Sequence, residues 1–151
     1  MHHDPLPPQP PLPFPAAQRY EDTVLEWARG QDASKLLARN QAYGPDPQHR
    51  YDVFAAAGMR DAPVLVFWHG GGWTNGYKEY VHFMAEAVIR RGLVFVAPTY
   101  RLAPRHRLPA AYDDAALLLG ELRRTVGKWG GDCRNLYLSG HSAGGGTAAM
   151  A

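Results

Sequence analysis

A serine flanked by glycines occupies residues 140–144, which read Gly-His-Ser-Ala-Gly. The motif follows an apolar run at 135–139 and precedes a helix-forming segment. A serine at a sharp strand-to-helix turn has a strained backbone, and its neighbours two residues away come so close that only small residues fit. The helix N-terminus that follows such a turn favours negative charge through its dipole and free N–H groups. The spacing therefore predicts that Ser142 is a nucleophile.

A run of glycines follows a second apolar segment, at residues 69–73, which read His-Gly-Gly-Gly-Trp. A tetrahedral intermediate places a negative charge on the former carbonyl oxygen, and backbone N–H groups reach that oxygen only where no side chain intervenes. A tight glycine turn or a phosphate-binding loop would also use glycines, but neither a G-x-G-x-x-G pattern nor a Walker lysine follows here. The run predicts an oxyanion loop.

Together and in this order, the two motifs resemble the lipase and esterase branch of the α/β-hydrolase fold, over roughly residues 40–151. Residues 100–104 (Tyr-Arg-Leu-Ala-Pro) and 108–111 (Leu-Pro-Ala-Ala) resemble hormone-sensitive-lipase-like esterases. His141, where that family usually has Asp, and residues 43–46 (Tyr-Gly-Pro-Asp) look more like arylformamidases and their carboxylesterase relatives. The resemblance implies hydrolysis of a carboxylic ester, or of an aryl formamide, through an acyl-serine intermediate.

The same resemblance assigns roles to single residues, with Ser142 as the nucleophile. The oxyanion hole would use the backbone N–H groups of Gly71, Gly72 and Ala143, with Gly70 as a further candidate. His69 would anchor the glycine loop through side-chain hydrogen bonds, and Trp73 would either wall the acyl or alcohol pocket or simply pack against its neighbours. No metal or cofactor is expected, and a small-molecule substrate is the predicted partner.

The other members of a catalytic triad do not follow Ser142. In this fold an Asp or Glu and then a His come after the nucleophile, but the nine residues that follow Ser142 include neither. The upstream histidines His82, His106 and His141 are predicted to have surface or hydrogen-bonding roles. We therefore expect the N-terminal portion of a hydrolase domain, which would be inactive by itself.

The elements that must position these motifs alternate between two patterns. Apolar, β-prone runs predict strands at 51–55, 64–68, 93–97 and 135–139. Helical spacing predicts helices at 20–28, at 80–88, from Pro109 to Trp129 and after Ser142. This alternation predicts an α/β fold with a parallel sheet, whose chemistry lies at the carboxyl ends of the strands. The strand at 136–138 would then be an unprotected edge.

Charged residues at the start of the third predicted helix have a plain structural explanation. Asp113 and Asp114 open that helix, where its dipole favours carboxylates whether or not they take part in catalysis. One of the two could also form a salt bridge with Arg101.

Proline is concentrated in the first fifteen residues, so we expect a disordered polyproline-II leader at 1–17 and one incomplete domain at 18–151. The Pro7–Pro10 and Pro10–Pro13 spacings would suit a domain that binds PxxP ligands. The favoured interpretation is a solvated leader, or coding sequence upstream of the true start. The prolines also stand where the apolar core of a signal peptide would lie.

Composition narrows the remaining classes. A net charge of +2 without a basic run argues against nucleic acids and anionic membranes, and no stretch approaches the roughly 20 apolar residues of a membrane span. One cysteine, Cys133, excludes an internal disulfide and is interpreted as a buried or spectator thiol. A cytoplasmic protein is expected, and its oligomeric state stays open.

Overall fold

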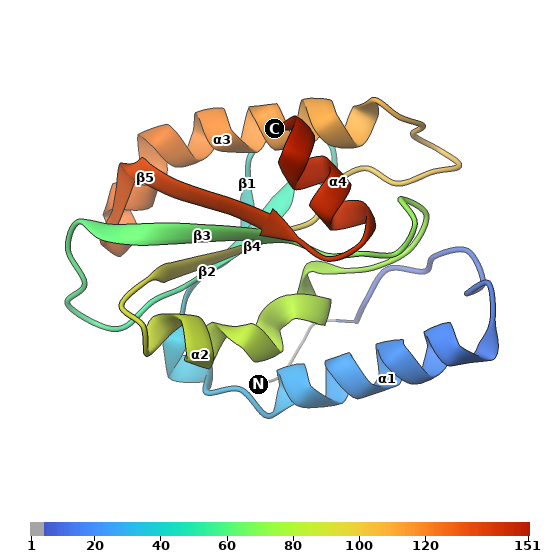
Figure 1. Ribbon diagram of the computed structural model, residues 1–151, viewed down its shortest axis with the longest axis horizontal. Coiled ribbons are helices and arrows are strands. Elements are labelled where there is room, and N and C mark those ends of the chain that lie inside the picture. Colours follow the sequence, from blue (N-terminus) through green and yellow to red (C-terminus); the bar gives the residue numbers. More distant parts are fainter. Residues whose placement is uncertain (1–4) are drawn as a thin grey trace.

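A five-stranded sheet between two layers of helices organises the molecule, as seen in the computed structural model, which describes residues 5–151 (Figure 1). The strands are β1 (Leu36–Ala42), β2 (Arg50–Phe54), β3 (Ala62–Trp68), β4 (Val94–Pro98) and β5 (Gly131–Gly140). The α-helices are α1 (Pro15–Arg29), α2 (Ala85–Ile89), α3 (Ala110–Thr125) and α4 (Ala143–Met150). The 3-10 helices are η1 (Ala33–Lys35), η2 (Lys78–Met84) and η3 (Val126–Trp129). The strand order is β1-β2-β4-β3-β5.

The parallel sheet expected from the alternating pattern is present in strands β3, β4 and β5. All five residues of β4 are buried, as expected of a strand with helices on both faces. On its other side β3 pairs with β5 in a register that sets Trp68 opposite Gly140. The carboxyl ends of β3 and β5 are therefore direct neighbours, and both sequence motifs begin there.

The other half of the sheet is antiparallel, which the alternating sequence pattern did not indicate. Strand β2 is antiparallel to both β1 and β4. The connection at 55–61 is too short for a parallel crossover, which needs about a dozen residues or more, so β2 and β3 run in opposite directions. Strand β1, which the sequence pattern did not indicate, joins β2 through the loop at 43–49 and closes the sheet on that side.

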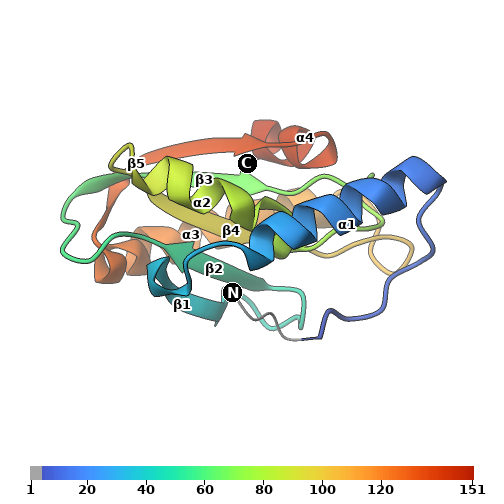
Figure 2. The ribbon, with the colours of Figure 1, turned by 90° about the horizontal axis from the view of Figure 1, so that it is seen from below.

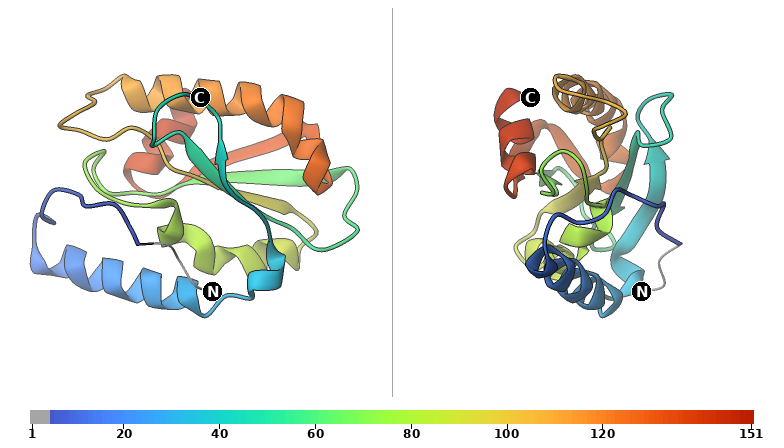
Figure 3. Two further views of the ribbon diagram at one scale, coloured as in Figure 1. Left: turned by 180° about the vertical axis from the view of Figure 1, so that it is seen from behind. Right: turned by 90° about the vertical axis from the view of Figure 1, so that its right-hand side faces the viewer.

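The two crossovers lie on opposite faces of the sheet. Helices η2 and α2 connect β3 to β4 on one face, where α1 also packs, and Figure 2 shows these helices side by side. Helix α3 connects β4 to β5 on the other face and lies beside α4 (Figure 3). The helices that follow β3 and β5 therefore lie on opposite faces of the sheet, and in open α/β sheets ligands bind at such a topological switch point.

Element boundaries differ from expectation in three places. The helix predicted at 80–88 is η2 followed by α2, and the helix predicted from Pro109 to Trp129 is α3 followed by η3, closed by Gly130 with φ 81°. Helix α1 begins at Pro15, inside the range assigned to the leader. Residues 1–4 of that leader lie outside the described part of the chain, and residues 5–14 contact the loop after β3, as detailed below.

Two further observations concern the single cysteine and the length of the helices. Cys133 is exposed on β5. Among residues 5–151, no helix combines the length and the apolar character needed to cross a membrane.

The open side of β5 predicts association between molecules at high concentration. Tyr137 is 55% exposed on this edge strand, and an unpaired strand edge is a template for pairing with another chain. Tyr137→Lys should therefore reduce the fraction of oligomer in sedimentation velocity. Leu117→Lys on α3, at an exposed apolar position away from the edge, is the matched control and should have little effect. Equal association of the wild type and Tyr137→Lys would contradict the prediction.

Candidate active site

The predicted turn around Ser142 is present between β5 and α4. Ser142 has φ 52° and ψ −119°, a conformation that is costly for a residue with a side chain. A Cβ atom on Gly140 would lie 2.3 Å from the carbonyl carbon of Gly144, and one on Gly144 would lie 2.2 Å from the Trp68 oxygen. Only glycine fits at either position, so the turn can bring Ser142 above the sheet without a clash.

The glycine loop after β3 folds back on itself over residues 69–76. Gly71, Gly72 and Trp73 all have positive φ angles, at 130°, 64° and 59°. The N–H of Asn75 donates to the Gly71 carbonyl at 3.0 Å, and a Cβ atom on Gly71 would lie only 1.9 Å from the Asn75 oxygen. Backbone thus packs on backbone within this oxyanion loop.

The oxyanion loop and the serine turn are in direct contact. A Cβ atom built on Gly70 would lie 3.2 Å from the Ser142 Cβ and 2.9 Å from the carbonyl oxygen of His141. The His141 N–H in turn donates to the Trp68 carbonyl at 3.1 Å. The two motifs, some seventy residues apart in sequence, therefore form one continuous surface.

Three backbone N–H groups at this junction have no acceptor. Among the hydrogen bonds of residues 5–151, none uses the N–H of Gly71, Gly72 or Ala143. Ala143 is the first residue of α4, and the N–H groups in the first turn of a helix lack partners within it. Free donors of this kind, fixed in place before a ligand arrives, suit a developing negative charge on oxygen.

A cavity of about 370 Å³ opens beside Ser142. Gly71 and Gly72 line it on the polar side, and the apolar wall comes from Leu12, Phe14 and other residues near the start of α1. Such a combination, a few convergent polar groups on an otherwise apolar wall, is typical of small-molecule sites.

Trp73 does not border this cavity. Its indole Nε1 donates to the Thr147 hydroxyl on α4 at 3.2 Å, and its ring meets Tyr112 edge to face at 6.5 Å. Of the two roles considered for Trp73, the structure favours packing against the helices over walling the pocket.

His69 lies under the oxyanion loop and is fully buried. Its Nδ1 donates to the Gly70 carbonyl at 2.7 Å, and its ring stacks on Tyr100 with 4.5 Å between centroids. Burial lowers the pKa of His69 to about 4, although the hydrogen bond to Gly70 and the charge of Glu79 act in the opposite direction. His69 is therefore neutral at pH 7, with its proton on Nδ1 and directed at the loop.

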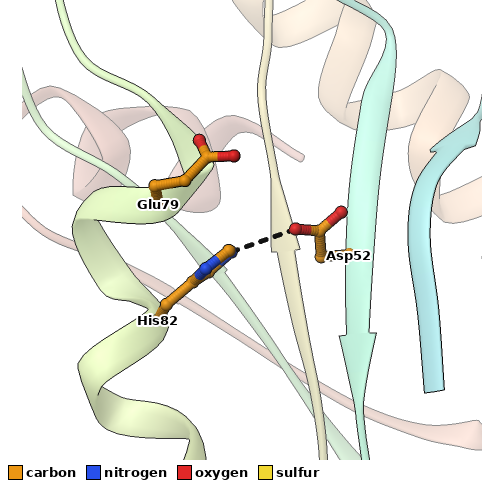
Figure 4. A group of neighbouring side chains, drawn as sticks. All are labelled: Asp52, Glu79 and His82. Atoms are coloured by element: carbon orange, nitrogen blue, oxygen red, sulfur yellow. Dashed lines mark ion pairs between the residues drawn. The ribbon is translucent and has the colours of Figure 1, made fainter. Parts of the chain in front are cut away.

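Behind the loop, η2 contributes a buried cluster of charged side chains (Figure 4). His82 Nε2 lies 3.2 Å from Asp52 Oδ2, and the Lys78 ammonium lies 3.0 Å from the same oxygen and also pairs with Glu79. Burial alone would raise the pKa of Asp52, but the hydrogen bond from His82 and the charge of Lys78 hold that pKa below its usual range.

The same cluster is where a metal ion would be sought. Potential ligand atoms of Asp52, Glu79 and His82 lie within 4.8 Å of one another. The Lys78 ammonium already contacts both carboxylates, so the chain itself supplies the positive charge that a cation would bring. We therefore interpret the cluster as a structural support for the loop at 69–76, which precedes η2.

The salt bridge considered for the start of α3 is formed by Asp114. Its Oδ1 accepts from Arg101 Nε at 2.8 Å and lies 2.9 Å from His49 Nε2. Asp114 is almost fully buried, which makes this arrangement a structural link between α3 and the loop after β4.

No described histidine is hydrogen-bonded to Ser142. The ring of His141 lies beside Tyr20, with 5.7 Å between centroids. His106 faces Asp46 at 3.6 Å, and His82 is buried against Asp52, so the expected hydrogen-bonding role holds for His82 but a surface position does not.

Comparison with known proteins identifies the family to which the chain belongs. A model of the alpha/beta hydrolase fold family matches residues 65–151, which include both the oxyanion loop and the serine turn. The chain belongs to the α/β-hydrolase family. Curated proteins similar to this chain include a carboxylesterase, an esterase and a probable methylesterase.

Two curated relatives and one solved structure show how similar the chain is to known esterases. Esterase LipC of Mycobacterium tuberculosis is 34% identical over 144 residues, which cover 87% of this chain and 36% of that protein. The probable isoprenylcysteine alpha-carbonyl methylesterase ICME of Oryza sativa is 32% identical over 119 residues, covering 78% and 29%. An esterase of Pyrobaculum calidifontis superposes with a TM-score of 0.71 at 27% identity, covering 89% and 45%. The chain thus spans between 29% and 45% of the length of these proteins.

The contribution of the N-terminal residues to the site was not predicted from the sequence. Leu12 and Phe14 line the cavity, yet their surroundings indicated only a proline-rich leader. The buried cluster left one local signal in the sequence. Asp52 lies between the apolar residues Tyr51 and Val53 of a strand, and a charge at such a position requires a partner.

The buried, neutral His69 predicts that the protein loses stability in mild acid. The unfolded state binds a proton near the ordinary pKa of 6.5 and the folded state only near 4, so His69 stabilises the fold fully above pH 6.5. As the pH falls from 6.5 to 4, the free energy of unfolding should drop by about 3 kcal/mol from this residue. Urea unfolding across that range measures the loss, and NMR titration of the His69 Cε1 resonance checks its source. A His69 that titrates near pH 6.5 would contradict the prediction.

Proposed function

We infer that the protein is a carboxylic ester hydrolase in which Ser142 is the nucleophile. The observation that carries this inference is the contact between the strained serine turn and a glycine loop with free N–H groups. Ser142, Gly71 and Gly72 all line one cavity, which supports this assignment. The ester-hydrolysing relatives support the same reaction class.

The proposed chemistry proceeds in two halves. The Ser142 Oγ attacks the ester carbonyl carbon while a general base takes its proton, and the carbonyl electron pair moves onto oxygen. The N–H groups of Gly71, Gly72 and Ala143 stabilise this oxyanion, each such donor being worth about 10²-fold or more in turnover. The intermediate then expels the protonated alcohol and leaves an acyl-serine, which water hydrolyses by the same route.

Substrate size and polarity follow from the cavity. Its volume of about 370 Å³ and its apolar wall suit an acyl or alkyl group of modest length. The methyl ester in the name of one relative and the general esterase name of another are consistent with a small leaving alcohol.

An aryl formamide is a second candidate substrate because the wall beside Ser142 is partly aromatic. His141 precedes the nucleophile, and its ring lies 5.7 Å from that of Tyr20. Both rings border the cavity, where an aryl group could pack against them. Rates for p-nitrophenyl butyrate and N-formylkynurenine, compared in one enzyme preparation, separate the two substrate classes.

The absence of an Asp and a His after Ser142 predicts how the printed chain behaves. A serine without a positioned base loses roughly 10⁶-fold in turnover, because its hydroxyl is a weak nucleophile near neutral pH. The 151 residues by themselves should therefore hydrolyse p-nitrophenyl butyrate at negligible rates. Joined to a segment that supplies Asp and then His in the order of the fold, the chain should become active, and Ser142→Ala should abolish that activity. Ordinary esterase turnover by the 151 residues, lost on mutating His82, His106 or His141, would refute this view.

The contact at Gly70 allows a second test in the active, joined form. Gly70→Ala adds a Cβ atom within 2.9 Å of the His141 carbonyl oxygen, so the oxyanion loop must move away from Ser142. A displacement of this kind should lower kcat by about 10²-fold. Gly131→Ala is the matched control, because its Cβ meets Val64 at 2.7 Å, at the opposite end of β5. The control should lower stability but leave the kcat of folded enzyme near wild type; equal kcat values for both variants would count against the oxyanion role.

A further inference from the structure

A single glutamine of the N-terminal segment pairs with the end of the oxyanion loop. Gln9 Nε2 donates to the Gly76 carbonyl at 2.7 Å, and the Gly76 N–H donates to Gln9 Oε1 at 2.7 Å. One carboxamide thus forms the same pair of hydrogen bonds that a neighbouring β-strand would form. Because both bonds must align together, this pairing fixes the orientation of Gly76 more closely than one bond would.

Two prolines flank this pair and also bind the loop. The Pro10 carbonyl accepts from Asn75 Nδ2 at 2.6 Å, and the Pro7 carbonyl accepts from the Tyr77 hydroxyl at 2.8 Å. Residues three apart share a face of an extended polyproline chain, so both carbonyls can point the same way. Residues 7–10, whose Pro7–Pro10 spacing would suit a PxxP-binding domain, therefore contact three consecutive residues of the same chain, Asn75, Gly76 and Tyr77.

Gly76 transmits this attachment to the oxyanion loop. Its φ angle is 112°, and a Cβ atom there would lie 2.3 Å from His69 Nδ1 and 2.4 Å from the Gly70 oxygen. With no side chain in between, a shift of Gly76 must also shift the backbone at Gly70. The neighbouring Asn75 packs in the same way on Gly71, where an added Cβ atom would lie 1.9 Å from the Asn75 carbonyl oxygen.

The same N-terminal segment continues into the wall of the cavity. Leu12 and Phe14 follow the attached residues directly and border the space beside Ser142. The chain then enters α1, where Tyr20 borders the cavity and packs edge to face on Tyr80 of η2 at 5.8 Å. One stretch of chain therefore both holds the loop and shapes the pocket.

We propose that Gln9 is a positioning residue for the oxyanion loop and that residues 5–14 act as an internal strap on the substrate site. The strap holds Gly76, and through it the N–H groups of Gly71 and Gly72, in the orientation that an oxyanion requires. It also sets Leu12 and Phe14 against the acyl or alkyl group of an ester. This inference rests on the esterase function proposed above.

The test compares Gln9→Met, which keeps the length of the side chain but cannot form either hydrogen bond, with the wild-type chain. Gln18→Ala is the control, since Gln18 is an exposed glutamine of α1 whose bonds reach only Glu21 and Asp22. In the 151-residue chain, amide hydrogen exchange at Gly76 should accelerate about tenfold or more in Gln9→Met. The ¹⁵N order parameters of Gly71 and Gly72 should fall as well, and Gln18→Ala should change neither quantity.

Kinetics in the joined, active form provide the functional measurement. Gln9→Met should lower kcat for p-nitrophenyl butyrate about tenfold, with a smaller effect on KM, because oxyanion donors act chiefly in the transition state. Unchanged exchange at Gly76 would overturn the strap itself. Faster exchange with unchanged order parameters and kcat would overturn the positioning role. If Ser142→Ala keeps the activity, the esterase proposal fails, while the order parameters of Gly71 and Gly72 still decide whether Gln9 positions the loop.

Discussion

The site depends on the close approach of two loops at the ends of neighbouring strands. Parallel strands lie only about 4.8 Å apart, so the loops that leave β3 and β5 side by side have no room for side chains between them. Gly70 and Gly144 supply that room, and each would clash with backbone if it carried a Cβ atom. The relative position of Ser142 and the oxyanion loop is thus fixed mainly by the hydrogen bonds of the sheet and less by flexible side chains.

Polar side chains support this junction from below. His69 is neutral and hydrogen-bonded to the Gly70 carbonyl, while Asp52 pairs with Lys78, the first residue of η2, which follows the loop. A buried charge that loses its partner is strongly destabilising, whereas a complete pair contributes little net stability. The cluster of Asp52, Lys78, Glu79 and His82 therefore matters chiefly for holding η2 in one position, and with it the end of the oxyanion loop.

Local patterns in the sequence predicted the parts of the fold that depend on local properties. The apolar runs of β3, β4 and β5 and the glycine spacing at residues 69–73 and 140–144 indicated the parallel strands and the serine turn directly. Strand β1 has no alternation of apolar and polar residues, and its pairing with β2 includes shifts in register, so no simple pattern marks it. Contacts between residues far apart in the sequence could not be predicted either, because no local pattern indicates them.

Two such contacts decide the surroundings of the site. Gln9 pairs with a residue 67 positions away, and Asp52 contacts Lys78 from another element. Nothing about a glutamine in a proline-rich stretch indicates what it will contact. A charged residue between apolar strand residues does indicate that a partner exists, because a buried charge without one is costly. The roles assigned to Ser142 and to the glycines rest on residue types that the chemistry itself requires, which is why they could be named in advance.

The strand order also has a consequence for biosynthesis. Strands β1 and β2 can pair across their short loop soon after they are made, and β4 then adds to β2 and brings β3 into the sheet. Until β4 is complete, the apolar β3 has no neighbour with which to pair, and this interval is the one in which a nascent chain most needs protection from aggregation. Strand β5 comes last and finds β3 already in place. Ser142, the proposed nucleophile, therefore joins the sheet after the other four strands have been made, and a chain that terminates after β4 lacks it.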